Sequence, residues 1–497
     1  MTVVTLEMAD IKHPDYILFE KRWEMIRDVL AGKEAIDKKG TQYLPKPSAY
    51  SSEQYLALQI RAVLYNATSR TLAGYLGAVY RKEADLELPS GLKYLEEDAD
   101  GQGNNLEQFS KKVSRDVIGM GRQGILVDYP QASSEVSLED ERNGNLRAHI
   151  SSYTPESIVN WSTKKVGAKT VLSAVMLLES RVVAGNGNHV FARDVQPIYR
   201  LLELDENGQY VQRTLVSVEK EDSEGNTRIV YQQEGEIIRP TLPNNRPLNY
   251  IPFIFVGSET ATPTPDLPPL YDLAQLNIAH YRQSADYEQA SFMLGQPTSW
   301  ISGCDAQFIE ANQGNLVIGS GATWLLPEGA LVGMLESSSD KTLIERGMEA
   351  KKSEMIGLGA RIVQDNSTRG SESTESVQLR RSGEASQLAC IADNVSSAMV
   401  QAFKWVAAWM GEPQDGIQYK LNKDFFAGRM SPQEQLSLVQ SWQSGAISHE
   451  VLLNNFRGGE IISELTTNED VLSQIDDEGP PLGEMDSEDE GELPEEE

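Results

Sequence analysis

The sequence predicts an α+β protein in which helical segments flank a sheet-forming middle. Two changes of hydrophobic period indicate this class. Apolar residues recur at helical spacing up to about residue 120 and again from residue 270, whereas residues 146 to 256 alternate with a period near two. The chain has 497 residues, of which 40% are hydrophobic, so it can form two or three hydrophobic cores.

The first third of the chain is predicted to be helical. Residues 18–31 end at Gly32 and carry an apolar stripe at Leu18, Trp23, Ile26 and Leu30. Residues 51–81 continue the same spacing. A helix is expected from about 106 to 120, and the apolar run 124–129 that follows it suits a buried strand.

The middle of the chain is predicted to be an antiparallel meander. Apolar residues alternate in four runs, at 170–183, 198–204, 210–218 and 228–232. Turn-forming residues separate these runs, for example Asp205-Glu206-Asn207-Gly208. A proline-rich connector at 262–269 then divides this block from the second half.

Three helices are predicted in the second half. Residues 270–295 are apolar on more than one face, so this helix must be covered on both sides, inside a core or by neighbouring subunits. A small β-containing module at 296–339 precedes a helix at 340–358. A polar loop at 359–373 leads to a helix at 374–410, whose length of roughly 55 Å would span a domain.

The C-terminal part is expected to hold a short extended piece at 417–421 and two helices. One helix begins at Ser431-Pro432 and the other near Ser448. From Asp476 to Glu497 there are twelve acidic residues and no basic one, so the tail 471–497 is predicted to be disordered.

Composition excludes several classes of protein. The net charge of −30 argues against a tight, static grip on nucleic acid, which needs concentrated positive charge. The two cysteines, Cys304 and Cys390, are too few for a disulfide scaffold and form no CxxC pair, which indicates a reducing compartment and no structural zinc. No secretion signal or membrane-spanning stretch is evident, which predicts a cytosolic protein without a membrane partner.

Two short motifs are better explained by local structure than by chemistry. Gly119-x-Gly121-x-x-Gly124 has dinucleotide-binding spacing, but its order of helix, glycines and strand is inverted, so a helix-to-strand turn is favoured. Asp98-x-Asp100-x-Gln102 resembles the start of a calcium loop, but Phe109 stands where a bidentate Glu is required. A turn that caps the next helix is therefore favoured.

No residue pattern predicts an enzyme. The chain lacks a GxxxxGK[ST] phosphate loop, and its five histidines are scattered singly, without an HExxH or Cys/His cluster. We therefore expect no catalytic residue, no metal site and no cofactor. Lys351-Lys352 and Arg380-Arg381 are the notable basic pairs of the second half; such pairs are usually solvated or salt-bridged, and the functional alternative is contact with phosphates.

Several blocks, taken in order, resemble the portal proteins of tailed bacteriophages, in particular a subfamily known only as an uncharacterised phage domain. The resemblance spans roughly residues 10 to 460 and depends on ordered agreement rather than on one signature. Its blocks are Trp23…Ile26-Arg27-Asp28…Gly32, Tyr43-Leu44-Pro45, Arg61-Ala62…Asn66-x-Thr68-x-Arg70-Thr71-Leu72…Gly77, Asp100-Gly101-x-Gly103-x-x-Leu106-x-Gln108-Phe109, Gly124-x-Leu126-Val127-Asp128, Ile251-Pro252-Phe253 and Leu273…Asn277…His280-Tyr281-x-x-Ser284.

The resemblance implies a portal fold assembled as a ring, most often of twelve subunits, at one vertex of the capsid. It assigns the wing to 1–269, the first stem helix to 270–295, the clip to 296–339, the second stem helix to 340–358, the tunnel loop to 359–373, the long wing helix to 374–410 and the crown to 411–470. Implied partners are further copies of the chain, double-stranded DNA that passes non-specifically, the terminase large subunit, head-completion or adaptor proteins and the major capsid protein. The implied location is the virion, with host cytoplasm during assembly.

Three sets of residues follow as candidate site residues. The tip of the tunnel loop nearest DNA is expected at Gln364, Asp365, Asn366, Ser367, Thr368 and Arg369. Lys351 and Lys352 are candidate bases of the channel lumen, where a ring would multiply a modest attraction. Packing between subunits is expected from the first stem helix, at Leu273, Leu276, Ile278, Tyr281, Tyr287 and Phe292.

Two other classes of protein stay open. A capsid scaffold or adaptor without a channel would give filled shells or irregular particles instead of rings. An enzyme built on spatially assembled acids would cleave DNA with a divalent metal. Neither alternative is favoured by the order of the sequence blocks.

Overall fold

The computed structural model contains both helix and sheet, as the sequence predicts. It describes residues 5–7, 11–129, 147–184, 193–221, 227–243, 246–295, 298–312, 325–335, 341–359, 374–425, 432–459, 461–462 and 466–478. The chain forms two compact units, residues 1–423 and residues 424–497. Each unit is described by itself.

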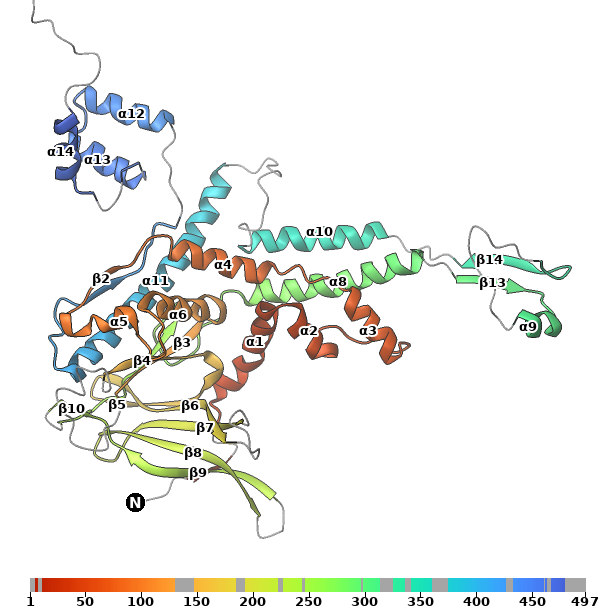
Figure 1. The fold of residues 1–497 in the computed structure, drawn as a ribbon, viewed down its shortest axis with the longest axis horizontal. Helices are drawn as coiled ribbons and strands as arrows, with labels where there is room; N and C mark the ends of the chain where they lie inside the picture. Colours follow the sequence, from red (N-terminus) through yellow and green to blue (C-terminus); the bar gives the residue numbers. More distant parts are fainter. Residues whose placement is uncertain are drawn as a thin grey trace, which may run out of the picture. The chain divides into compact units, whose positions relative to one another are not determined.

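The N-terminal helices of the first unit include α1, α2, α3, α4, α5 and α6, at Pro14–Ala31, Lys33–Lys39, Ser52–Arg61, Ala67–Val79, Tyr94–Glu97 and Leu106–Met120 (Figure 1). Helix α1 ends at Gly32, whose φ of 97° few other residues tolerate. Its predicted stripe is wrong at Leu18, which is 61% exposed, because the covered face runs instead through Phe19, Trp23 and Ile26.

The helical spacing predicted over 51–81 belongs to two helices, with a break between α3 and α4. Asn66 caps α4 by accepting a hydrogen bond from Ser69 N, which starts a new helix. The side chain of Asn277, on a distant helix, accepts from Thr68 N and donates to the Tyr65 carbonyl. These contacts satisfy the backbone groups that the break exposes, and hydrophobic spacing alone gives no sign of them.

A three-stranded sheet follows α6. Its order is β12-β3-β4, antiparallel throughout, with the strands at Phe253–Gly257, Arg122–Asp128 and His149–Tyr153. The predicted helix-to-strand turn is confirmed at Gly121, which caps α6 with φ 72°. A Cβ at Gly121 would lie 2.9 Å from the Leu267 carbonyl oxygen, so the connector passes too close for a side chain.

The predicted meander is confirmed as a six-stranded antiparallel sheet of order β1-β9-β8-β7-β6-β5. Its strands β1 and β5 to β9 are Thr5–Glu7, Ile158–Val166, Lys169–Ala184, Arg193–Leu204, Tyr210–Glu221 and Thr227–Ile238. The sequence gives no sign of β1, a three-residue strand that pairs Leu6 with Tyr231 at the β9 edge.

The remaining short elements close the loops of the first unit. Strand β2 (Asp85–Glu87) pairs with β15 (Gln418–Lys420), and β10 (Thr241–Leu242) pairs with β11 (Arg246–Pro247). The described residues include 3-10 turns at Gly40–Gln42, Ser90–Leu92 and Pro155–Ser157. The segment that resembles a calcium loop is a turn, because Asp98 and Asp100 accept backbone N–H groups of Gly103 and Gln102.

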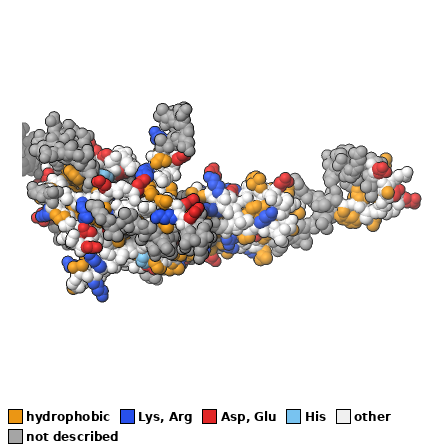
Figure 2. All heavy atoms as spheres, turned by 90° about the horizontal axis from the view of Figure 1, so that it is seen from below, with side chains coloured by type: hydrophobic (Ala, Val, Ile, Leu, Met, Phe, Trp, Pro, Cys, Tyr) orange, Lys and Arg blue, Asp and Glu red, His pale blue; other side chains and the backbone are white. Residues whose placement is uncertain are grey.

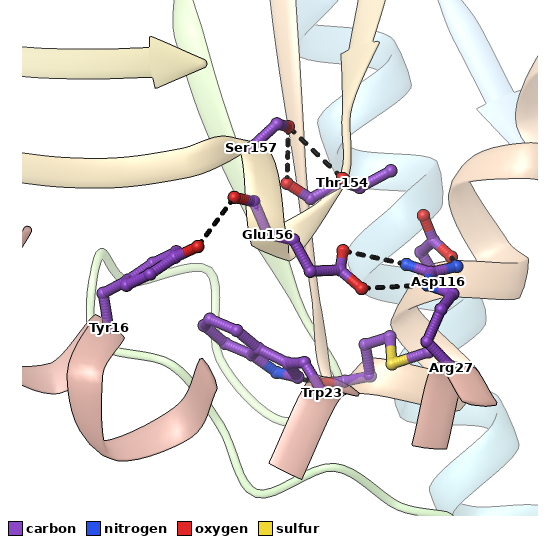
Figure 3. A network of polar contacts seen from close by, with 8 residues as sticks. Tyr16, Trp23, Arg27, Asp116, Thr154, Glu156 and Ser157 are labelled. Atoms are coloured by element: carbon purple, nitrogen blue, oxygen red, sulfur yellow. Dashed lines mark hydrogen bonds and ion pairs between the residues drawn. The ribbon is translucent and has the colours of Figure 1, made fainter. Parts of the chain in front are cut away.

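A part-buried ion-pair network joins α1, α6 and the turn before β5 (Figure 3). The Arg27 guanidinium donates to Asp116 Oδ1 at 2.9 Å and to both carboxylate oxygens of Glu156 at 2.8 and 2.9 Å. Beside it, the Trp23 indole donates to the Met120 carbonyl at 3.0 Å. The network therefore holds α1 against α6 and against the turn before β5.

The second half begins with α8 (Tyr271–Gly295), then β13 (Thr298–Ser302), α9 (Ala306–Asn312), β14 (Leu331–Leu335), α10 (Lys341–Gly357) and α11 (Thr374–Met410). The described residues of the predicted β-containing module include an antiparallel pair, β13 with β14, and a helix α9 that the sequence pattern does not indicate. The long helix α11 has 37 residues and buries Val395, Phe403 and Val406.

The second unit contains α12 (Pro432–Gln443), α13 (His449–Gly458) and α14 (Asn468–Glu478). The prediction of disorder from 471 is wrong for 471–478, which belong to α14. Thr467 and Asp470 cap this helix reciprocally, and Arg457 of α13 donates to the Thr466 carbonyl just before it. The acidic residues 479–497 lie outside the described residues.

Candidate functional site: the paired helices α8 and α10

Helices α8 and α10 lie side by side, which makes them one structural element (Figure 1). Lys351 Nζ donates to Gln283 Oε1 at 2.5 Å, and the Tyr287 hydroxyl donates to Glu345 at 2.8 Å. A Cβ at Gly347 would lie 2.1 Å from the Gln283 amide nitrogen, at the flexible end of that side chain. Glycine at 347 therefore leaves room for the position in which Gln283 accepts from Lys351.

The prediction of ring packing through Leu273, Ile278 and Tyr281 is wrong for this fold. All three are at most 3% exposed within their own subunit, because α1, α3 and α4 cover that face of α8. The Tyr281 hydroxyl also donates to Asp37, which draws it inward. The second apolar face of α8 is thus satisfied by distant parts of the same chain.

Three other predicted packing residues of α8 keep exposed surface. Leu276 and Tyr287 are half-buried. Phe292 is 38% exposed, and the Arg61 guanidinium lies over its ring at 4.1 Å from the centroid. Exposed apolar surface is therefore left at Leu276 and towards the C-terminal end of α8.

A groove of about 650 Å³ lies between α8 and α10. Its apolar floor includes Leu276, Ala279 and Leu358, of which Leu358 is 49% exposed. Asp272 and Glu354 bring two carboxylates to the same groove. The groove thus combines apolar surface with negative charge.

Cationic side chains gather around the ring of Tyr65. The Arg70 guanidinium and Lys352 Nζ each lie 5.9 Å from the ring centroid, and the His280 ring lies 5.8 Å from it. We call these four residues the Tyr65 cluster. Among the described residues, neither Arg70 nor Lys352 forms an ion pair with a carboxylate, so the cluster keeps an excess of positive charge.

The pKa of His280 depends on the burial and the charges of this cluster. Its side chain is 6% exposed, and Nδ1 has no hydrogen-bond partner among the described residues. Burial lowers the pKa of His280 below 6.5, and the charges of Lys351 and Lys352 lower it further, against a smaller opposing effect of Glu349. His280 is therefore held neutral beside the two lysines.

The groove and the Tyr65 cluster face opposite sides of α10. Lys352 and Glu354 are two residues apart on this helix, and a helix turns about 200° over two residues. Lys352 is directed to Tyr65, whereas Glu354 lines the groove. One helix pair thus presents a basic surface on one side and an acidic one on the other.

The structure brings only some of the predicted site residues together. Lys351 and Lys352 share α10, but Lys351 is turned towards α8, and their role as lumen bases stays a prediction. The loop residues 364–369 lie outside the described residues. Sequence reasoning missed the groove and the partners of Lys352, although Arg70 and His280 stand in the blocks of the portal resemblance.

Charges are mixed on one face of the molecule. On the face drawn in Figure 2, the basic and acidic side chains of the described residues are interspersed rather than gathered by sign. No group of three or more metal-ligating side chains occurs in the described part of the chain, and no helix there is long and apolar enough to cross a membrane.

Comparison with known proteins gives one family match. Residues 269–410, from just before α8 to the end of α11, match a domain of unknown function, DUF4055. No curated protein matches the sequence.

Similar solved structures come from gene transfer agent particles. A chain of the "Neck of native GTA particle computed with C12 symmetry" is 11% identical, with a TM-score of 0.39, over 81% of this chain and 93% of that one. A chain of the "Virion of native gene transfer agent (GTA) particle" is 12% identical, with a TM-score of 0.39, over 81% and 91%. At these TM-scores the likenesses carry no further argument.

Proposed function

We propose that this chain is the subunit of a phage portal, a ring at one capsid vertex through which DNA enters and leaves the head. The observation that carries the proposal is the succession of α8, the β13–β14 module, the adjacent helix α10 and the long helix α11. The portal resemblance implies this order as first stem helix, clip, second stem helix and long wing helix.

In this proposal each part of the chain has a mechanical task. The paired helices α8 and α10 form the wall of the channel, and the β13–β14 module docks the packaging terminase and later the head-completion proteins. The loop 359–373 approaches the DNA, and residues 411–470 form the crown. The wing, residues 1–269, meets the major capsid protein.

The charge of the chain supports passage of DNA rather than retention. A net charge of −30 gives few attractive contacts to phosphates, so a duplex can slide without salt-dependent trapping. The chain has no phosphate-binding loop of its own, so the energy of translocation comes from the terminase. The subunit acts without catalysis and without a cofactor.

The decisive experiment is native mass together with electron microscopy of the purified protein. We expect closed rings of about twelve copies of the 55.0 kDa chain, with a central hole as wide as duplex DNA. A stable monomer at high concentration, or a particle with a solid centre, would refute the proposal. Filled shells would favour a scaffold, and metal-dependent cleavage of DNA would favour an enzyme.

A second experiment tests the loop. Deletion of 364–369 should leave rings intact while it lowers DNA packaging or retention. Normal packaging and retention by the deletion variant would show that this loop does not contact DNA.

A further inference from the structure

Two surfaces of the first unit have complementary chemistry. The groove between α8 and α10 carries Asp272 and Glu354 beside apolar side chains. The Tyr65 cluster carries Arg70 and Lys352, and Val63 nearby in the chain is 53% exposed. One surface is therefore acidic and apolar, and the other is basic and apolar.

Neither surface is neutralised by the residues that the structure describes. Among the described residues, none of the four charged side chains Asp272, Glu354, Arg70 and Lys352 forms an ion pair, although many basic residues elsewhere in the unit do. In a chain of net charge −30, an unpaired basic cluster has an abundance of possible acidic partners. A second copy of this chain would supply such partners.

The placement of the two surfaces matches the geometry of a closed ring. Each subunit of a ring contacts its two neighbours through different surfaces, which lie on different sides of the subunit. Lys352 and Glu354 point to opposite sides of α10. In a ring, Lys352 can therefore contact the adjacent subunit on one side while Glu354 contacts the adjacent subunit on the other side.

We propose that the Tyr65 cluster of one copy docks on the groove between α8 and α10 of the next copy. This inference rests on the ring proposed above and names the surfaces that close it. Arg70 and Lys352 approach Asp272 and Glu354 of the neighbour, while Val63 and the ring of Tyr65 cover the exposed Leu358. An aromatic ring with an adjacent Arg is a frequent interface anchor, and the charges fix the register of the contact.

The first test is a charge swap on α10. Lys352→Glu alone places like charges across every contact, as does Glu354→Lys alone, and each should weaken self-association about tenfold per contact. The double variant restores opposite charges at every contact, so it should recover assembly. Lys164→Glu, an exposed position on β5, is the matched control and should assemble normally. Native mass at several concentrations measures each variant.

The second test is cross-linking between copies. Lys352→Cys and Asp272→Cys are combined with Cys304→Ser and Cys390→Ser, which remove the two native thiols. Because 352 and 272 lie on opposite sides of the helix pair, a short bismaleimide joins them only between copies. Denaturing gels should then show a ladder of multimers up to the closed ring, and either single-cysteine variant should not extend beyond dimers.

The outcomes separate this inference from the proposed function. A wild-type protein that stays monomeric refutes the ring, and the contact with it. Wild-type rings that show no ladder, or a double charge swap that assembles no better than the single variants, overturn the contact and leave the ring standing.

Discussion

Replacement of Arg27 by methionine should destabilise the first unit strongly, because it leaves a buried carboxylate without its cation. The Asp116 side chain is only 7% exposed and loses a charge-assisted hydrogen bond from Arg27, which contributes about 1.5–3 kcal/mol. The pair with Glu156 is more open, with side chains 39% and 32% exposed, so it adds at most about 1 kcal/mol. We expect Arg27→Met to lower the free energy of unfolding by about 2–4 kcal/mol at pH 7.

The pH dependence of this loss identifies its origin. Burial already raises the pKa of Asp116 above 3.8, and Arg27 opposes the increase. Without Arg27 the pKa of Asp116 rises further. As the pH falls, Asp116 in the variant becomes protonated, and the free-energy cost of its unpaired buried charge is removed. The difference between wild type and Arg27→Met should therefore be largest near pH 7 and smaller near pH 5.

Urea unfolding followed by tryptophan fluorescence measures the effect, because Trp23 lies one turn from Arg27. The protein concentration is held constant, since self-association also changes apparent stability. Asp116→Asn added to Arg27→Met should recover most of the loss at pH 7. A loss below about 0.5 kcal/mol, or one that does not change with pH, would show that Asp116 does not depend on Arg27.

Four further predictions concern single residues. Gly121→Ala should lower the melting temperature more than Gly208→Ala, because both have φ near +70° but only Gly121 has a backbone oxygen 2.9 Å from the added Cβ; equal effects would contradict the close approach. Lys352→Gln should raise the pKa of His280 towards 6.5 in an NMR titration, since it removes a positive charge that lowers it; an unchanged pKa would place Lys352 elsewhere. Because the folded pKa of His280 lies below its unfolded value, its contribution to stability should fall as the pH drops below 6.5, and His280→Gln should weaken that dependence. Ser448→Ala should speed amide exchange in α13 by about fivefold, from the loss of about 1 kcal/mol of capping; unchanged exchange would show that the cap contributes nothing.

Local signals predicted the regular elements well. Gly32 ends α1, Ser448 caps α13, and the helix expected at 374–410 is found as α11. The alternating runs of the middle segment became β6 to β9, although the strands extend beyond those runs. Caps, turns and hydrophobic period are all properties of neighbouring residues, so one sequence contains them.

The candidate site was less accessible to sequence reasoning. The two apolar faces of α8 indicated burial on both sides but did not reveal that α1, α3 and α4 cover one of them. Lys352 was found as a basic residue, whereas its position beside Tyr65 depends on the break at 62–66 and on Asn277. The relevant residues are separated by more than 200 positions, and hydrophobic period does not report such contacts.

The pairing of β15 with β2 limits how far the chain can be truncated from its C-terminal side without loss of contacts in the first unit. Tyr419 is 3% exposed and packs on Phe403, and the backbone N–H of Leu421 donates to the Ser396 hydroxyl of α11. Truncation after Gly411 would remove the contacts of Tyr419 and Leu421 with α11. It would also leave β2 without its partner strand β15. A protein that ends after Lys423 keeps them, so proteases that trim the C-terminal region should yield a resistant fragment ending near that residue.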